Sequence, residues 1–130
     1  MAAPVDSTRT FRTKWFSKAA RKALITDRQL CEAIEQVRKG QADDLGGGVY
    51  KKRLDKNRYR GIILAKGGAL WVYEYLFAKK DRANIEEDEL DAFRKLAAGY
   101  AVLNAQQLQQ LLDDDDLMEI CNDGQAQVQE

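Results

Sequence analysis

The sequence has no histidine, two cysteines and a single proline among its 130 residues. The absence of histidine excludes a histidine acid–base pair and removes one of the usual ligands of a zinc site. Cys31 and Cys121 stand far apart and form no Cys-x-x-Cys motif, so we expect two reduced thiols in a cytoplasmic protein. No stretch approaches the roughly 20 apolar residues of a membrane span. The N-terminus lacks the apolar segment of a signal peptide.

The net charge is zero, because 21 basic residues balance 21 acidic ones. A neutral total argues against a general nucleic-acid binder, but the two signs are unevenly distributed along the chain. Basic residues dominate from Thr8 to Arg60, and acidic residues dominate from Glu86 onward. This asymmetry favours a basic surface built by the first half of the chain.

The length suits one domain with one hydrophobic core and is too short for two. The proline and several small polar residues lie near the N-terminus, and the last residues are rich in glutamine. We expect a flexible N-terminal tail over residues 1–9, a folded domain over 10–121 and a disordered C-terminal tail over 122–130.

The N-terminal part of the domain predicts one strand and two helices. Aromatic residues alternate with basic or polar ones over 10–16, which is typical of a short strand. Residues 17–24 are basic and rich in alanine and favour a short helix. Thr26 and Gln29 have the spacing of a capping box, so we expect a second helix from Asp27 to about Lys39.

The middle of the chain predicts three antiparallel strands. They cover residues 49–54, 59–65 and 70–77, where aromatic and β-branched residues are common. A tight connection at 55–58 links the first two strands, and Gly67-Gly68 is a strong hairpin signal between the second and third. The three strands should therefore form a meander.

The C-terminal part predicts two helices and a strand. Asn84 with Glu87 has the form of a capping box, as does Asn104 with Gln107, and residues 117–121 suit an edge strand. One face of the first of these helices carries Leu90, Phe93, Ala97, Tyr100 and Ala101. Together the elements predict an α+β fold, with a small antiparallel sheet made of the N-terminal strand and the meander and with helices packed on one face.

The densest cluster of cations lies on the first two strands of the meander. Alternate residues of a strand share a face, so Lys51 and Arg53 project together. A hairpin places Arg58 and Arg60 on the neighbouring strand. Such a surface suits a phosphodiester, because fixed cations bind the phosphate and stabilise the extra charge of its transition state. Arg60 can hold two phosphate oxygens at once, which a lysine cannot do.

The charge pattern also fits a plainer explanation. Basic residues on strands often solvate an exposed sheet face or protect an edge. Residues 79–82 follow the third strand and either add Lys79, Lys80 and Arg82 to the same basic surface or form a solvated loop. The pattern alone leaves both alternatives open.

Three other features favour structural explanations. Gly46 to Gly48 lack the spacing of a P-loop and precede a strand, and the consecutive carboxylates of 113–116 cannot easily converge on a metal ion. We therefore expect neither a metal nor a cofactor. A strict alternation of aromatics indicates core rather than a platform for stacked bases in Trp71, Tyr73, Tyr75 and Phe77. Trp15 and Phe16 have no assignment from the sequence.

Five segments in order resemble the RelE/HigB-type toxins of bacterial type II toxin–antitoxin systems, within the RelE/ParE superfamily. The segments are F-R-T-K-W-F, D-L-G-G-G-V-Y-K-K-R, Y-R, F-A-K-K-D-R-A-N-I and E-L-D-A-F-R-K-L-A. More narrowly, the chain is similar to the branch with a GGGVxKKR strand and an FAKNxRxNI segment. The resemblance covers residues 11–120 and implies a RelE-like fold.

The resemblance implies a ribosome-dependent mRNA endoribonuclease, or mRNA interferase, that inhibits translation. In such enzymes the 2′-hydroxyl of the mRNA attacks the adjacent phosphate without a metal. The implied partners are the ribosome, mRNA and a cognate antitoxin that is itself a small DNA-binding protein. Promoter DNA would be bound only through the antitoxin complex, and no membrane is involved.

The resemblance also assigns roles by motif position. Lys51 and Arg53 match the lysines that take part in proton transfer and phosphate binding, and Arg60 matches the arginine that stabilises the phosphate. Lys79 or Lys80 matches the position of a proton donor to the leaving oxygen. The catalytic candidates are Lys51, Arg53, Arg60 and Lys80. The RNA-binding candidates are Lys52, Arg58, Tyr59, Lys79 and Arg82. A lysine that acts as base needs a lowered pKa, which clustered cations can produce.

The chain departs from the family pattern in places, and two other functions stay open. Residues 57–60 replace a longer glycine- and lysine-rich loop, Lys80 stands where many relatives have asparagine, and Ile85 and Glu86 stand where some relatives carry a base-stacking tyrosine. One alternative is a gyrase-inhibiting toxin of the ParE type, which shares the fold but needs no catalytic cluster. The other is a non-catalytic binding protein derived from a toxin.

Overall fold

The structure, a computed structural model, describes residues 8–67 and 69–121. The predicted tails over 1–9 and 122–130 lie outside these residues, except that Thr8 is described and Arg9 already belongs to the first strand. Gly68 of the predicted hairpin turn also lies outside them. The described elements are β1 (Arg9–Thr13), α1 (Lys14–Ala23), α2 (Asp27–Arg38), β2 (Asp43–Gly46), β3 (Val49–Leu54), β4 (Tyr59–Lys66), β5 (Leu70–Ala78), α3 (Glu87–Ala101), α4 (Ala105–Asp113) and β6 (Leu117–Ile120).

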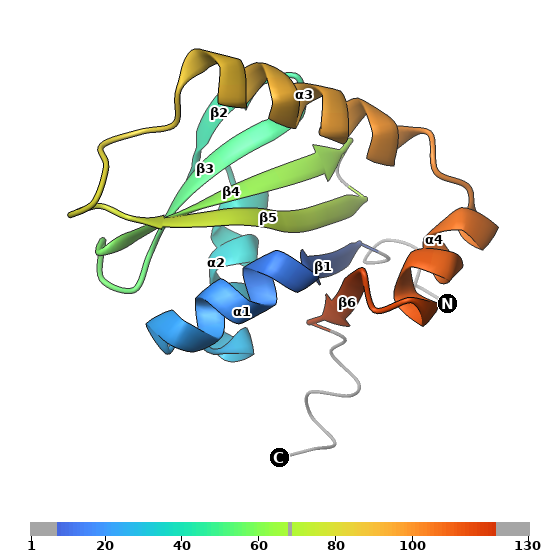
Figure 1. Cartoon of the computed structure of the whole chain (residues 1–130), viewed down its shortest axis with the longest axis horizontal. Coiled ribbons are helices and arrows are strands. Elements are labelled where there is room, and N and C mark those ends of the chain that lie inside the picture. The colour runs from blue at the N-terminus through green and yellow to red at the C-terminus, as the bar shows by residue number, and fades with distance from the viewer. Residues whose placement is uncertain (1–7, 68, 122–130) are drawn as a thin grey trace.

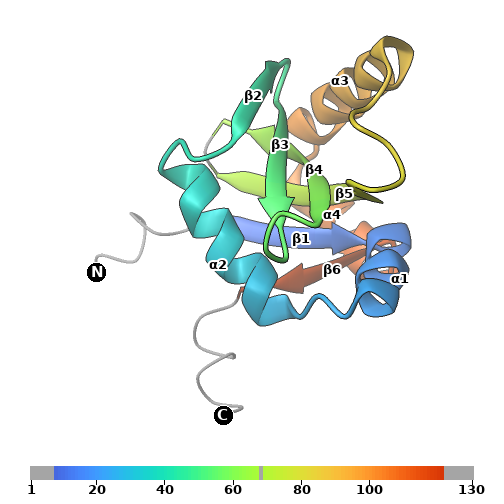
Figure 2. The ribbon, with the colours of Figure 1, turned by 90° about the vertical axis from the view of Figure 1, so that its left-hand side faces the viewer.

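A six-stranded sheet with the order β2-β3-β4-β5-β1-β6 forms the centre of the fold, as Figure 2 shows. Neighbouring strands are antiparallel except β1 and β5, which run parallel. The predicted meander corresponds to β3, β4 and β5, and the predicted edge strand corresponds to β6. The predicted α+β class is confirmed. The sequence did not predict β2, because its four residues carry no apolar alternation.

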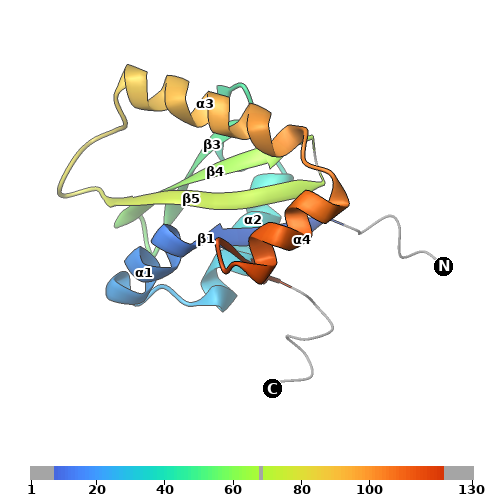
Figure 3. The same cartoon turned by 45° about the vertical axis from the view of Figure 1, so that its right-hand side comes forward.

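Helices cover both faces of the sheet rather than the single face that was expected (Figure 1). We call these the α1/α2 face, where Phe16 and Leu30 pack, and the α3 face, where Ala97 packs. The reason lies in β4, whose consecutive residues Ile62 and Ile63 point to opposite faces and are both fully buried. A sheet that is apolar on both sides must be covered on both sides. α4 packs beside β6, the edge strand at the opposite end of the sheet from β2 (Figure 3).

The first strand is shorter than predicted. β1 ends at Thr13, and α1 begins at Lys14, inside the segment 10–16 that was expected to be extended. The hydroxyl of Thr13 accepts a hydrogen bond from the backbone N–H of Phe16 (3.0 Å) and so caps the helix. The cap turns Phe16 into the core and leaves Trp15 half-exposed at the surface.

A β-bulge at Glu74 divides β5 into two halves. The register with β4 shifts here, so that one residue of β5 has no partner on β4. Trp71 and Tyr73 therefore pack on the α1/α2 face, whereas Tyr75 and Phe77 pack on the α3 face. A strict alternation would have placed all four aromatics on one face. The bulge thus moves two of them to the face that carries α3.

The start of α3 differs from the prediction, whereas the capping boxes of α2 and α4 are confirmed. α3 begins at Glu87, and the backbone N–H of Glu86 donates to the carboxylate of Glu89 (2.6 Å). The predicted box of Asn84 with Glu87 is therefore wrong. The Asn84 side chain instead accepts hydrogen bonds from Lys51 Nζ and from the backbone N–H of the next residue.

The two cysteines form a disulfide, so the expectation of two reduced thiols is wrong. Cys31 of α2 and Cys121, just after β6, are bonded with their Cα atoms 5.4 Å apart. Both side chains pack against the apolar cluster of the α1/α2 face, and the bond joins α2 to the residue that follows β6. In the described part of the chain, no helix has both the length and the apolar character needed to cross a membrane.

Candidate active site

Three of the four predicted catalytic cations lie on the α3 face of neighbouring strands. Lys51 and Arg53 alternate along β3, and Arg53 is paired directly with Arg60 of β4. Val49 precedes them on the same face and is fully buried in the cluster beneath α3. The face is therefore apolar under the helix and basic toward the turn between β3 and β4. We call Lys51, Arg53 and Arg60 the cation strip.

The two guanidiniums of the cation strip carry charge that no carboxylate in the described part of the chain neutralises. Arg60 Nη1 donates to the carbonyl oxygens of Asn57 (3.0 Å) and Tyr59 (3.2 Å), which orient the group without cancelling its charge. Arg53 is exposed. Paired cations of this kind attract an anion, because neither has an internal counterion to displace.

Lys51 is held more firmly than its two neighbours. Its Nζ donates to Asn84 Oδ1 (3.2 Å) and lies 3.8 Å from Asp43 Oδ2, and its side chain is 15% exposed. Asp43 belongs to β2, the edge strand that the sequence did not predict. The lysine is thus positioned by one group from β2 and one from the segment that precedes α3.

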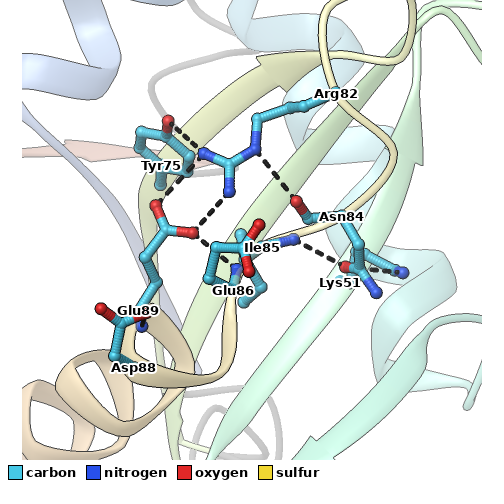
Figure 4. A network of polar contacts seen from close by, with 8 residues as sticks. All are labelled: Lys51, Tyr75, Arg82, Asn84, Ile85, Glu86, Asp88 and Glu89. Atoms are coloured by element: carbon cyan, nitrogen blue, oxygen red, sulfur yellow. Dashed lines mark hydrogen bonds and ion pairs between the residues drawn. The ribbon is translucent and has the colours of Figure 1, made fainter.

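Arg82, a predicted RNA-binding residue, forms an ion pair with Glu89 of the same chain (Figure 4). Its guanidinium binds both carboxylate oxygens of Glu89 and donates to the hydroxyl of Tyr75 (3.3 Å). The hydrogen bond with Glu89 raises the pKa of Arg82, and the same bond holds the pKa of Glu89 below its usual range. Arg82 Nε also donates to the carbonyl of Asn84 (3.0 Å). The network therefore fixes the loop that positions Lys51, and Arg82 has less free charge than Arg60.

Lys52, another predicted RNA-binding residue, points to the opposite face. Its Nζ donates to the carbonyl of Gln41 (3.1 Å). Burial, and then the charge of Arg53, lower the pKa of Lys52. Lys52 thus lies outside the cation strip, on the face that carries α1 and α2.

The remaining predicted residues gather around an open hollow of about 810 Å³ at the end of the sheet. The hollow lies between the end of α1, the turn that joins β3 to β4, and the end of β5. Predicted site residues that line it are Arg58, Tyr59, Lys79 and Lys80. Tyr59 packs on the α1/α2 face. The structure therefore places Lys80 with this second group and not in the cation strip.

Sequence reasoning missed several residues that surround the cation strip or hold the neighbouring Lys52. Asn84 was assigned to a helix cap, and Asp43 and Gln41 lie in a segment without periodicity, so no local pattern linked them to the lysines. Trp15 was left unassigned, and the bulge that turns Tyr75 toward the strip has no sequence signal. In the described residues, no three carboxylate or cysteine side chains come together as possible metal ligands.

A comparison with protein families identifies the family of the chain. The model of a family described as the RelE toxin of the RelE/RelB toxin–antitoxin system matches residues 8–120. The chain belongs to the RelE toxin family. A search of curated proteins and a search of solved structures gave no significant match. The match spans β1 to β6 and includes every residue of the cation strip. The chain is thus a toxin of a toxin–antitoxin system, and RelE toxins pair with antitoxins.

Proposed function

We propose that this RelE toxin is a ribosome-dependent endoribonuclease that cuts mRNA and so inhibits translation. The observation that carries the proposal is the direct pairing of Arg53 with Arg60 on the α3 face, next to Lys51. A phosphodiester gains negative charge in its transition state, and two unneutralised guanidiniums stabilise that charge. Such a pair has no evident use in the stability of the sheet, because like charges on facing strands repel each other.

The proposed reaction uses only groups of the RNA and of the protein. The 2′-oxygen of the RNA attacks the adjacent phosphorus, and the bond from phosphorus to the 5′-oxygen breaks. Lys51 removes the proton of the 2′-hydroxyl, Arg53 and Arg60 hold the phosphate, and a proton donor protonates the 5′-oxygen. Lys80 stays the predicted donor, although it lines the hollow. The chain has no histidine for either proton transfer.

The proposed activity implies particular partners and a cellular location for the protein. mRNA in the ribosome is the substrate, and the RNA backbone or ribosomal RNA contacts the cations of the hollow. An antitoxin that covers the cation strip blocks the substrate and neutralises the toxin. We infer a cytoplasmic protein, since translation takes place there, and residues 10–121 as the toxin domain.

The test is primer extension on a reporter mRNA after induced expression of the toxin, with translation either running or blocked at initiation. We compare the wild type with Arg60→Ala, and with Lys66→Ala as the control, since Lys66 is an exposed cation at the other end of β4. We expect cuts in the coding region that require translation. Arg60→Ala should reduce cleavage by about 100- to 1000-fold, as the loss of a transition-state donor does. Lys66→Ala should cut like the wild type.

Other outcomes would overturn the proposal. Growth arrest with intact mRNA would point to another target such as gyrase. No arrest at all would indicate a protein that binds its partner without catalysis. Equal loss of cleavage in both variants would remove Arg60 from the reaction and leave only a general charge effect.

A further inference from the structure

Trp15 is an exposed aromatic side chain that the proposed reaction does not use. It lies in the first turn of α1, where its indole stacks on the ring of Tyr75 with centroids 5.0 Å apart and planes 23° apart. Tyr75 is supported on another side by Phe93 of α3, with centroids 5.8 Å apart. Even so, 51% of Trp15 stays exposed. The indole is therefore fixed on a rigid base while half of it contacts solvent.

The register of the sheet places this stack beside the cation strip. Residues paired across the strands form two rows on the α3 face. One row joins Lys51 of β3 through β4 to Tyr75 of β5, and the other joins Arg53 through Arg60 to Phe77. Neighbouring strands are about 4.8 Å apart, so the stack lies about two strands from Lys51. The indole of Trp15 stacks on Tyr75, which is the β5 member of the first row.

The chemistry of this surface fits single-stranded RNA. A fixed aromatic ring with one open side stacks on any base, and cations beside it hold the phosphates. Arg53 and Arg60, whose guanidiniums have no neutralising carboxylate among the described residues, belong to the row next to that of Tyr75. Lys18, which is also exposed, lies three residues after Trp15 and so on the same side of α1.

We propose that Trp15 is a stacking platform for one nucleobase of the RNA whose phosphate is bound by the cation strip. The inference rests on the proposed function for its ligand. It adds a residue from α1 to a site that β3 and β4 otherwise form, and it makes Trp15 a determinant of RNA affinity. The bulge at Glu74 is what turns Tyr75 to the α3 face and so supports the platform.

The test measures binding of an eight-nucleotide RNA whose 2′-hydroxyls are methylated, so that it cannot be cut. The matched variants are Trp15→Ala, Trp15→Phe and, as a control, Val102→Ala, since Val102 is another exposed apolar side chain. Loss of one stacked base should weaken binding by about 5- to 150-fold. Trp15→Phe should keep part of the affinity, and Val102→Ala should keep all of it. Retained thermal unfolding of each variant shows that the fold is intact.

A double-mutant cycle identifies the contact. The same RNA is made with one abasic nucleotide at each position in turn. At one position, the abasic RNA should bind the wild type as weakly as the intact RNA binds Trp15→Ala. When this abasic RNA is combined with Trp15→Ala, the loss of affinity from the missing base and the loss from the substitution should not add. RNA should also quench the fluorescence emission of Trp15, which is measured as the difference between the wild type and Trp15→Phe. The other tryptophan, Trp71, is buried and should not be quenched by RNA.

The outcomes separate this inference from the proposed function. Quenching and a non-additive cycle with a wild type that cuts no mRNA would uphold the platform and overturn the nuclease. If the wild type cuts mRNA and Trp15→Ala binds RNA as tightly as the wild type does, the nuclease would be upheld and the platform overturned. Additive losses at every position would also overturn the platform.

Discussion

At the scale of the residue, the surroundings of each cation decide what it can do. Arg60 is oriented by two carbonyl oxygens and keeps its charge for a ligand, whereas Arg82 is neutralised by Glu89. The sequence predicted contact with the RNA for both arginines, Arg60 as a catalytic residue and Arg82 as a binding residue. Only the first has the charge that a phosphate requires, and the second acts through the side chains that it holds in place.

Glu74 allows a prediction about pH at the same scale. Burial raises the pKa of this carboxyl, and the hydroxyl of Tyr100 lies 3.4 Å from its Oε1. A raised pKa means that the folded state favours the protonated form, so the stability from Glu74 is present at low pH and is lost as pH rises through the folded pKa. Glu74→Gln should therefore raise the free energy of unfolding more at pH 7 than at pH 4, measured with urea. An equal effect at both values would contradict the prediction.

At the scale of the element, the connection from β2 to β3 explains how closely α3 approaches the sheet. Gly48 has φ +83, and a Cβ at this position would lie 2.8 Å from the carbonyl oxygen of Ala65 and 3.3 Å from Ala97 of α3. Only glycine avoids both the backbone strain and the collision. The start of β3, and with it the position of Lys51, depends on this contact.

A substitution at Gly48 tests this contact, and Gly40 provides the control. Gly48→Ala should lower the free energy of unfolding by more than about 1 kcal/mol, because strain and collision add. Gly40 also has a positive φ of +91, but a Cβ there meets nothing within 4 Å. Gly40→Ala should therefore show the backbone cost alone. Equal losses in chemical denaturation would show that the contact with β4 contributes nothing.

At the scale of the whole molecule, the disulfide joins two segments that are 90 residues apart in sequence. A bond that closes so long a loop restricts the unfolded chain, by up to about 4.7 kcal/mol for a loop of about 100 residues. It ties β6, the edge strand beside β1, to α2. In a reducing cytoplasm the bond would be open, so the molecule there would be less stable than when oxidised.

Reduction tests this prediction directly. Dithiothreitol should lower the free energy of unfolding of the wild type by a few kcal/mol, as a native disulfide of this loop length does. The variant Cys31→Ser with Cys121→Ser should match the reduced protein and should not respond to dithiothreitol. A wild type that is insensitive to reduction would show that the thiols are free in solution.

The sequence by itself determined much of the local structure of this protein, although not β2, the end of β1 or the start of α3. Capping boxes at Thr26 and Asn104, the limits of β3 and the meander follow from interactions between residues close in the chain, which a local pattern records. The clustering of Lys51, Arg53 and Arg60 also followed, because alternation on a strand and one hairpin suffice to bring them together.

Only the tertiary structure decided what surrounds those cations. The bulge at Glu74 turns Tyr75 onto the α3 face, and the cap at Thr13 puts Trp15 beside it. The cap at Thr13 is itself a local interaction between Thr13 and Phe16. The bulge results from strand pairing and the Trp15–Tyr75 stack from packing, and both join segments that are separated in the sequence, so a local pattern does not record them. The same holds for the carboxylate that neutralises Arg82 and for the disulfide. The residue types determine which side chains are charged. Which of these charges stay without a neutralising partner depends on contacts that form only when the chain folds.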